Sequence, residues 1–226
     1  MSPDSVWHLE DVLDLYAEPD DPRYPPVCFD ESPVQLTSET RHPRPARPGQ
    51  PARYDTEYKR EGTANLFLFV QPLRGWRHVN VTPQRTHQDF AHQMRVLVDD
   101  YFPTAERIRL VLDNLNTHTP AALYRVLPPA EARRIIRKLE FHYPPKHGSW
   151  LNMAECELAV LAGQCLDRCI PSIEVLRVEI AAWQDPRNAR QTKIHWQFSN
   201  EVARTKLKRL YPTIEPTEDS ASSAEA

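Results

Sequence analysis

The chain has 226 residues, of which 40% are hydrophobic, and its formal net charge at pH 7 is −3. This length and composition suit one domain with a sizeable core, and the weak charge excludes a polycation that binds nucleic acid indiscriminately. No stretch approaches the roughly 20 apolar residues of a membrane span, and the first residues lack the basic start and apolar run of a signal peptide. We therefore expect a cytoplasmic protein.

Residue spacing disfavours two common kinds of site. The four cysteines include no Cys-x-x-Cys pair, unlike the paired spacing of most zinc sites. The five glycines form neither a Gly-x-Gly-x-x-Gly nor a Walker pattern, so no phosphate-cradling loop is predicted. Charge is unevenly placed, because the N-terminal segment is acidic whereas residues 41–60 are basic.

The chain starts with an acidic lead-in, residues 1–21, in which helical spacing of apolar residues predicts a short helix over 6–16. A first strand over 24–31 follows and ends in carboxylates. Residues 40–62 are rich in proline and arginine and have no apolar period. We therefore predict an extended arm, inserted between the first and second strands.

The rest of the chain alternates between strands and helices. A hairpin connection at 72–75 joins the second and third strands. Strands are predicted over residues 63–70, 77–82, 108–112 and 140–143, and helices over 86–101, 120–126, 130–139, 150–166, 172–185 and 200–210. Residues 213–226 are acidic and rich in serine and alanine, so this tail is expected to be disordered.

This order of elements predicts the fold. Three strands with tight connections form an antiparallel meander, and the later strand–helix alternation adds parallel strands to the same sheet. We therefore predict an α/β domain over residues 22–212 with an RNase H-like fold. Its sheet would be mixed, with five strands, and flanked by helices.

Carboxylates stand at the ends of two predicted strands. Asp30 ends the first strand and Asp113 follows the fourth, and these strands are neighbours in such a sheet. Two clustered carboxylates repel each other unless a cation neutralises them, and oxygen ligands suit Mg²⁺ or Mn²⁺. The alternative is that each aspartate only caps a turn. A third acid would come from the helix over 150–166, where periodicity does not decide between Glu155 and Glu157.

Three motifs occur in order along the chain: Phe-Asp30-Glu, Leu-Asp113-Asn-Leu-Asn-Thr-His118 and Tyr-Pro-Pro-Lys-His-Gly-Ser-Trp-Leu-Asn-Met-Ala-Glu155. Together they resemble the DDE transposases, specifically the bacterial insertion-sequence branch of the mariner-like superfamily. The resemblance implies that Asp30, Asp113 and Glu155 are the catalytic residues and bind two Mg²⁺ or Mn²⁺ ions. Met153 stands where many relatives have a proline. A proline fits the first turn of a helix but is not required there.

The resemblance also suggests roles for residues around this triad. Asn114 and Asn152 would orient the carboxylates. His118 would lie near the metal or the scissile phosphate, although a polar histidine at a helix start is the alternative. Phosphate contacts are expected just before the Glu155 helix, from Lys146, His147 and Ser149.

The arginine-rich arm has three interpretations. Its position matches the clamp-like insertion that mariner-like transposases use in subunit pairing, but its arginines could instead contact DNA, or the loop could be inert. The residues concerned are Arg41, Arg44, Arg47 and Arg53. Relatives carry a helix-turn-helix region upstream, and residues 1–25 do not have the pattern of one. We therefore expect a catalytic half that forms a homodimer or pairs with a partner bearing a helix-turn-helix.

The function implied is that of a metal-dependent DNA endonuclease and strand transferase. It would cut transposon ends and join the freed 3′-hydroxyl to target DNA. No membrane partner is expected. Two alternatives stay open. One is a catalytically idle remnant or regulatory subunit. The other is a structure-selective nuclease of the same fold, such as a junction resolvase.

Overall fold

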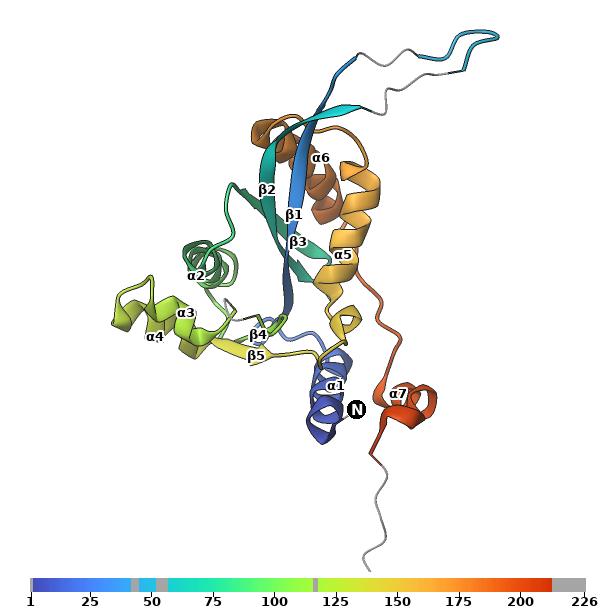
Figure 1. The fold of residues 1–226 in the computed structure, drawn as a ribbon. Coiled ribbons are helices and arrows are strands. Elements are labelled where there is room, and N and C mark those ends of the chain that lie inside the picture. The colour runs from blue at the N-terminus through green and yellow to red at the C-terminus, as the bar shows by residue number, and fades with distance from the viewer. Residues whose placement is uncertain (1, 42–44, 52–56, 116–117, 213–226) are drawn as a thin grey trace, which may run out of the picture.

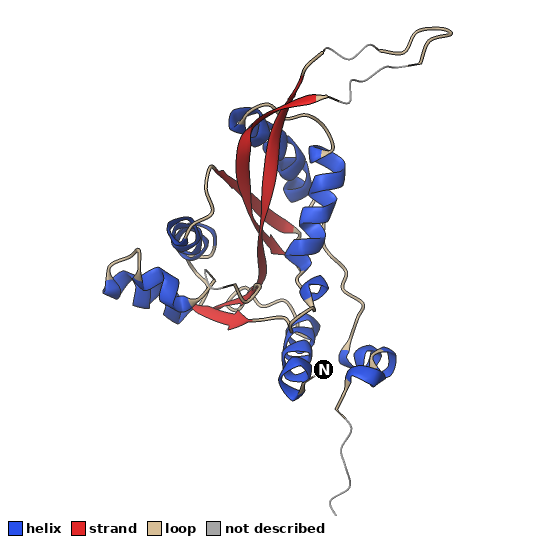
Figure 2. Cartoon of the chain, viewed as in Figure 1, coloured by secondary structure: helices blue, strands red, loops and turns tan. Residues whose placement is uncertain are grey.

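A central mixed sheet organises the protein. The computed structural model describes residues 2–41, 45–51, 57–115 and 118–212. Five strands pair in the order β3-β2-β1-β4-β5, with helices on both faces (Figures 1 and 2). The meander β1-β2-β3 is antiparallel, and β4 and β5 add parallel to β1, which confirms the predicted mixed sheet. The strands are β1 (Pro26–Glu39), β2 (Tyr58–Gln71), β3 (Trp76–Thr82), β4 (Ile108–Val111) and β5 (Leu139–His142).

The central strand β1 separates two hydrophobic cores. Phe29 belongs to the core on one face of the sheet, whereas Cys28 belongs to the core on the other face. Successive side chains of a strand point to opposite faces. This alternation directs Asp30 to the Cys28 face and Glu31 to the Phe29 face, so two adjacent carboxylates leave the strand in opposite directions.

The Cys28 face is covered by helices from both ends of the chain (Figure 1). These are α1 (Pro3–Ala17), α5 (Met153–Leu161), α6 (Ile173–Ala189) and α7 (Asn200–Lys206). The first of them starts at an N-cap serine, Ser2, and buries Leu9, Val12 and Leu13 in the same core as the sheet. The lead-in helix is therefore packed into the body of the protein.

Shorter helices cover the Phe29 face. α2 (His87–Val96) starts with a capping box between Thr86 and Asp89, a pattern that satisfies the free N–H groups of the first turn. It continues as one π-helical turn, η1 (Leu97–Tyr101), and is followed by α3 (Pro120–Tyr124) and α4 (Pro129–Lys138). Phe90 and Met94 of α2 are buried against the sheet.

Two sequence-based boundaries were wrong. The first strand does not end at Asp30 but continues to Glu39, and β2 already begins at Tyr58, so the predicted arm over 40–62 is shorter. The outer parts of β1 and β2 pair as a two-stranded ribbon that projects beyond the helices (Figure 1). Because residues 58–63 of this ribbon are exposed, no apolar alternation marks them as a strand.

Some predictions fall outside the described residues. These are Arg44, Arg53 and the tail over 213–226. Among the residues that the structure describes, no helix is long and apolar enough to cross a lipid bilayer.

Candidate active site

Two of the predicted acids come from neighbouring parallel strands. The parallel pairing of β1 and β4 ends where Cys28 lies opposite Val111. Asp30 and Asp113 each lie two residues beyond that pair, at the carboxyl end of β4. Sites of open α/β sheets are usually found at this edge.

The third acid comes from the first turn of α5, which is fastened to the sheet. Asn152 is the N-cap of α5, and its side-chain oxygen accepts a hydrogen bond from the Ala154 N–H at 3.1 Å. Its side-chain amide donates to the carbonyl oxygen of Phe29 at 2.9 Å. The start of α5 is thereby held beside Asp30. Glu155 follows within this turn, and its Oε2 is buried without a hydrogen-bond partner.

The other glutamate of α5 is committed elsewhere. Glu157 Oε1 lies 2.8 Å from Nε of Arg77, whose side chain is 1% exposed. The structure therefore distinguishes two acids that periodicity leaves equivalent. Glu157 is paired with an arginine, whereas Glu155 has a buried oxygen without a hydrogen-bond partner and acts electrostatically on Asp30.

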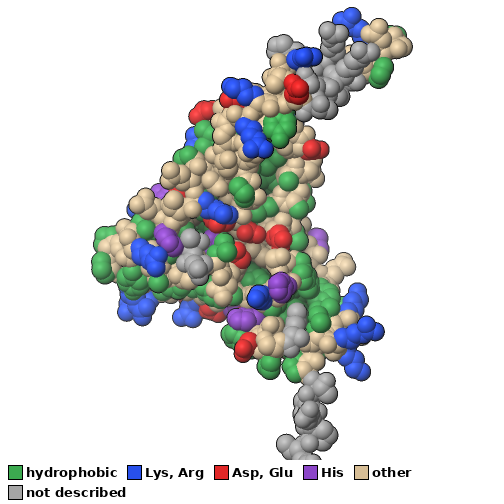
Figure 3. Space-filling model, in the orientation of Figure 1, with side chains coloured by type: hydrophobic (Ala, Val, Ile, Leu, Met, Phe, Trp, Pro, Cys, Tyr) green, Lys and Arg blue, Asp and Glu red, His purple; other side chains and the backbone are tan. Residues whose placement is uncertain are grey.

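The charges of Asp113 and Glu155 act on the Asp30 carboxyl. Burial, together with the negative charges of Asp113 and Glu155, raises the pKa of the Asp30 carboxyl to about 7. A hydrogen bond of 2.8 Å from the Glu31 N–H to Asp30 only partly opposes these effects. Figure 3 shows acidic side chains gathered near the centre of one face, level with the lower end of α5.

The donor set fits a hard divalent cation in its chemistry. It offers carboxylate oxygens, one of them buried and unpaired on Glu155, and such oxygens are the ligands that Mg²⁺ and Mn²⁺ prefer. In the arrangement seen here, however, no three His, Cys, Asp or Glu side chains of the described residues converge closely enough to hold an ion. Asp113 instead contacts Nδ1 of His118.

His118 is a buried link between two acids. Its side chain is 0% exposed, with Nδ1 against Asp113 and Nε2 at 3.4 Å from Glu31 Oε2. The second distance is that of an ion pair and is too long for a good hydrogen bond. Burial by itself would lower the pKa of His118, but contacts with these two carboxylates raise it to about 9. The imidazole therefore favours its cationic form between them.

The remaining predicted residues lie on the surface around this centre. Asn114 is exposed beside Asp113. In the turn before α5, His147 has a φ of 66°, which is uncommon for a residue other than glycine. Lys146, His147 and Ser149 are all exposed there.

The arm residues that the structure describes are exposed as well. Arg47 pairs with Gln50 through two backbone hydrogen bonds of 2.9 and 2.8 Å, which close a tight turn. Arg41 is exposed near the end of β1. Neither arginine lies at the edge of the sheet that carries the acids.

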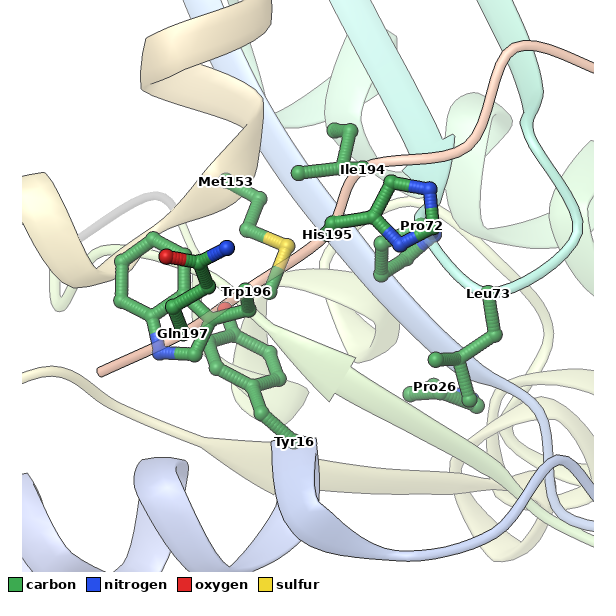
Figure 4. Close-up of a pocket in the computed structure, with 9 residues that line it drawn as sticks. All are labelled: Tyr16, Pro26, Pro72, Leu73, Met153, Ile194, His195, Trp196 and Gln197. Atoms are coloured by element: carbon green, nitrogen blue, oxygen red, sulfur yellow. The ribbon is translucent and has the colours of Figure 1, made fainter. Parts of the chain in front are cut away.

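A separate cavity does not coincide with the acids. It has a volume of about 330 Å³ and lies between α1, the start of α5 and the segment that follows α6 (Figure 4). Its walls are mostly apolar and include none of the predicted site residues. They are formed by Tyr16, Pro26, Pro72, Leu73, Met153, Ile194, His195, Trp196 and Gln197. Because it lacks the carboxylates, we place the chemistry at the acidic edge and not in this cavity.

Residues 25–177 match a protein family described as DDE superfamily endonuclease. The chain belongs to this family. No curated protein sequence matches it significantly. The sequence-based recognition of a DDE enzyme is thus confirmed at the level of the family.

Solved structures of the Mos1 mariner transposase are similar to this chain in fold. A paired-end complex with Mn has a TM-score of 0.56 and 16% identity, over 84% of this chain and 59% of that chain. A strand transfer complex has a TM-score of 0.57 and 16% identity, over 83% of this chain and 56% of that chain. The Mos1 catalytic domain has a TM-score of 0.54 and 11% identity, over 87% of this chain and 98% of that chain.

These matches confirm the RNase H-like fold that the order of strands predicted. This chain spans 59% and 56% of the Mos1 chains in the first two complexes, but 98% of the separate catalytic domain. The likeness is therefore to the catalytic part of that transposase.

Sequence reasoning missed the partners of His118. Glu31 was quoted only as the neighbour of Asp30, yet its side chain is 4% exposed and also lies 3.3 Å from Nε of Arg85. Strand alternation contained the signal, because a glutamate next to an inward-facing aspartate in a doubly covered strand must be buried on the opposite face. A buried carboxylate needs partners.

Proposed function

We propose that this DDE endonuclease is the catalytic part of a transposase. In this proposal it cuts DNA at the ends of a mobile element and joins the freed 3′-hydroxyl to target DNA. The observation that carries the proposal is that Asp30 lies near enough to Asp113 and Glu155, at one edge of the sheet, for their charges to help raise its pKa to about 7. Perturbed carboxylates of this kind are characteristic of functional sites.

The three carboxylates would hold Mg²⁺ or Mn²⁺, two ions in our reading. Such ions supply activation of a water or hydroxyl and neutralisation of charge on the phosphate. In the first reaction a water oxygen would bond to phosphorus and lose a proton, while the bond from phosphorus to the 3′ oxygen breaks and that oxygen takes up a proton. In the second, this 3′-hydroxyl oxygen would bond to a target phosphorus and lose its proton, while the target 3′ oxygen is displaced and takes up a proton.

Other residues would place the DNA and the acids. Asn152 holds the helix that carries Glu155, and Asn114 lies beside Asp113. The exposed side chains of Lys146, His147 and Ser149 would contact phosphate oxygens before α5.

The partners follow from the same proposal. The Mos1 structures are named as paired-end and strand transfer complexes, with Mn or Mg in some of them. By analogy, we propose that this chain binds transposon ends and target DNA in the cytoplasm, as a homodimer or with a helix-turn-helix-bearing partner. Its arm, including Arg41 and Arg47, would contact the second subunit or DNA.

The test is DNA cleavage by the purified protein. We expect nicking of supercoiled DNA that requires Mg²⁺ or Mn²⁺, stops with EDTA and shows weak sequence preference. Asp113→Asn should lose this activity and keep the wild-type circular dichroism spectrum. Equal nicking by the wild type and Asp113→Asn would show that the assignment of the acids is wrong.

One observation favours a second function, that of a non-cutting regulatory subunit. Asp113 contacts His118 and does not join the other acids as a ligand set among the described residues. Such a subunit would bind an intact relative and lower its activity without cutting DNA itself. Mixing the two proteins in a cleavage assay, with and without Asp113→Asn in this chain, distinguishes the two functions.

A further inference from the structure

Glu31 is a buried carboxylate to which the proposed reaction gives no role. Its side chain is 4% exposed, and its two oxygens face different cations. Oε1 lies 3.3 Å from Arg85 Nε, and Oε2 lies 3.4 Å from His118 Nε2. Removal of a carboxylate from water costs free energy unless the carboxylate is paired, so Arg85 and His118 must offset this cost for Glu31.

His118, the inner partner of Glu31, is restrained from several directions. Its ring stacks on Phe90 with centroids 5.0 Å apart and meets the edge of Phe29 at 5.3 Å. Its backbone carbonyl accepts a hydrogen bond from the Tyr143 hydroxyl at 3.3 Å. The ring thus has its plane fixed by the aromatic neighbours, while Glu31 faces one of its nitrogens and leaves the other for Asp113.

Asp113 needs such a restraint. It lies beyond the last residue of β4, and its side chain is 38% exposed. The strand alone therefore does not fix where its carboxylate points. Contact with a fully buried imidazole gives it a defined direction, at the edge of the sheet where Asp30 also lies.

We propose that Glu31 is a positioning residue which, through His118, fixes the direction of the Asp113 carboxylate. The inference rests on the proposed function, because Asp113 is there a ligand of the metal. The chain of contacts runs Arg85–Glu31–His118–Asp113 and crosses from the Phe29 face to the edge of the sheet. Partners that orient a ligand from outside are typically worth 10- to 100-fold in metal affinity or activity.

The experiment compares two buried glutamates in the full chain. Glu31→Ala removes the partner of His118, and Glu157→Ala is the matched control, since Glu157 is also buried and paired with an arginine but does not contact the acids. Glu31→Gln keeps an oxygen that can face His118 and serves as the conservative variant if the alanine variant fails to fold.

Three quantities are measured for each variant. Mn²⁺ affinity comes from the electron paramagnetic resonance of free Mn²⁺ without DNA, and nicking is measured at saturating and at limiting Mn²⁺. In the metal-free protein, NMR follows the contacts of the His118 ring protons with the rings of Phe29 and Phe90. His118→Gln identifies its signals among those of the nine histidines.

Glu31→Ala is expected to weaken Mn²⁺ binding about 10- to 100-fold, lose the ring contacts of His118 and nick mainly at high Mn²⁺. Glu31→Gln should restore most of the affinity, and Glu157→Ala should bind Mn²⁺ as the wild type does. Equal Mn²⁺ affinity and unchanged ring contacts in Glu31→Ala would overturn the inference, as would an equal loss of affinity in both alanine variants.

Failure of the proposed function gives a different result. The wild type would then neither bind Mn²⁺ nor nick DNA. Release of the His118 ring in Glu31→Ala alone would still support the link from Glu31 to His118, and an unchanged ring would refute it.

Discussion

Glu155 and Glu157 lie two residues apart on α5 and have opposite surroundings. Glu157 faces a buried guanidinium at 2.8 Å, whereas Glu155 keeps a buried oxygen without a partner beside two other acids. A paired carboxylate stabilises the fold around it. An unpaired one adds repulsion, and so remains available to a cation.

The cluster around Glu157 is organised as a structural joint. Each nitrogen of the Arg77 guanidinium faces an oxygen, from Glu157 and from the carbonyls of Gly75 and Thr192. The Asn188 side chain binds the backbone N–H and C=O of Arg77 at 2.9 and 2.8 Å. This joint links β3, α5 and α6 with a carboxylate and a guanidinium of opposite charge, whereas the acidic site gathers carboxylates of like charge.

The largest expected effect separates the two glutamates by activity. Glu155→Gln should lower DNA nicking by more than about 100-fold, because loss of a direct ligand should exceed the 10- to 100-fold cost of losing an outer partner. Glu157→Gln should change nicking per folded molecule by less than about 3-fold. Steady-state cleavage with the folded fraction measured alongside tests both. Similar losses in the two variants would remove the distinction between them.

The next effect concerns stability and the Arg77 joint. Arg77→Met removes the close counter-ion of buried Glu157 and leaves only Arg187 Nε, 3.9 Å from Glu157 Oε1. Breaking a buried pair typically costs about 3–5 kcal/mol of unfolding free energy, and the remaining arginine should keep the loss at the lower end of this range. Urea unfolding followed by circular dichroism measures the loss. Adding Glu157→Leu to Arg77→Met should recover part of it, because the poorly paired charge is then gone. No recovery would mean that the hydrogen bonds of Arg77, and not its charge, hold the joint.

The acidic site should respond in the opposite direction. Without metal, Asp30→Asn is expected to raise the unfolding free energy at neutral pH by about 1–2 kcal/mol, below the roughly 4 kcal/mol that a shift of three pKa units allows. The pKa of Asp30 is raised in the fold from 3.8 to about 7. The folded protein thus binds the proton more tightly, and wild-type stability falls as pH rises from about 4 to 7.

The pH dependence provides the check on that variant. The difference in Tm between Asp30→Asn and the wild type, measured in EDTA, should be small near pH 4 and should grow up to about pH 8. A constant difference across this range would show that repulsion and burial of the Asp30 charge are not its cause.

Periodicity and the order of elements predicted the sheet, which of its strands are neighbours, and the edge of the sheet at which Asp30 and Asp113 lie. These features follow from local patterns, since apolar runs mark strands and tight connections mark the meander. The outer ends of β1 and β2 were not predicted, because a ribbon that is exposed to solvent on both sides has no apolar alternation in its sequence. Pairing between strands, which local sequence does not encode, extends them.

The partners of each acid were beyond local patterns as well. Glu155 and Glu157 flank the same stripe, and the positions of Arg77 and Arg187, both outside α5, distinguish them. The Glu31–His118 contact likewise joins distant segments. Alternation in β1 gives the face of Glu31 but not the residue that meets it there.

The smallest expected effect lies far from both clusters, where α1 meets α7. Glu10 accepts two hydrogen bonds from Arg204, at 2.8 and 2.7 Å, and this interaction lowers its pKa below the usual 4.5. A carboxyl whose pKa is lowered in the fold stabilises it above the unfolded pKa, and this contribution is lost as pH falls through the folded value. Glu10→Gln should therefore lower Tm slightly at pH 7, and the difference should shrink as pH falls below about 4.5. Because the pair is partly exposed, 1 M salt should shrink the difference at pH 7.

Asp14→Asn, which alters a contact with the neutral Asn200 in the same helix pair, is the control and should respond less to salt. A difference for Glu10→Gln that persists at pH 3 would assign its effect to packing and not to charge.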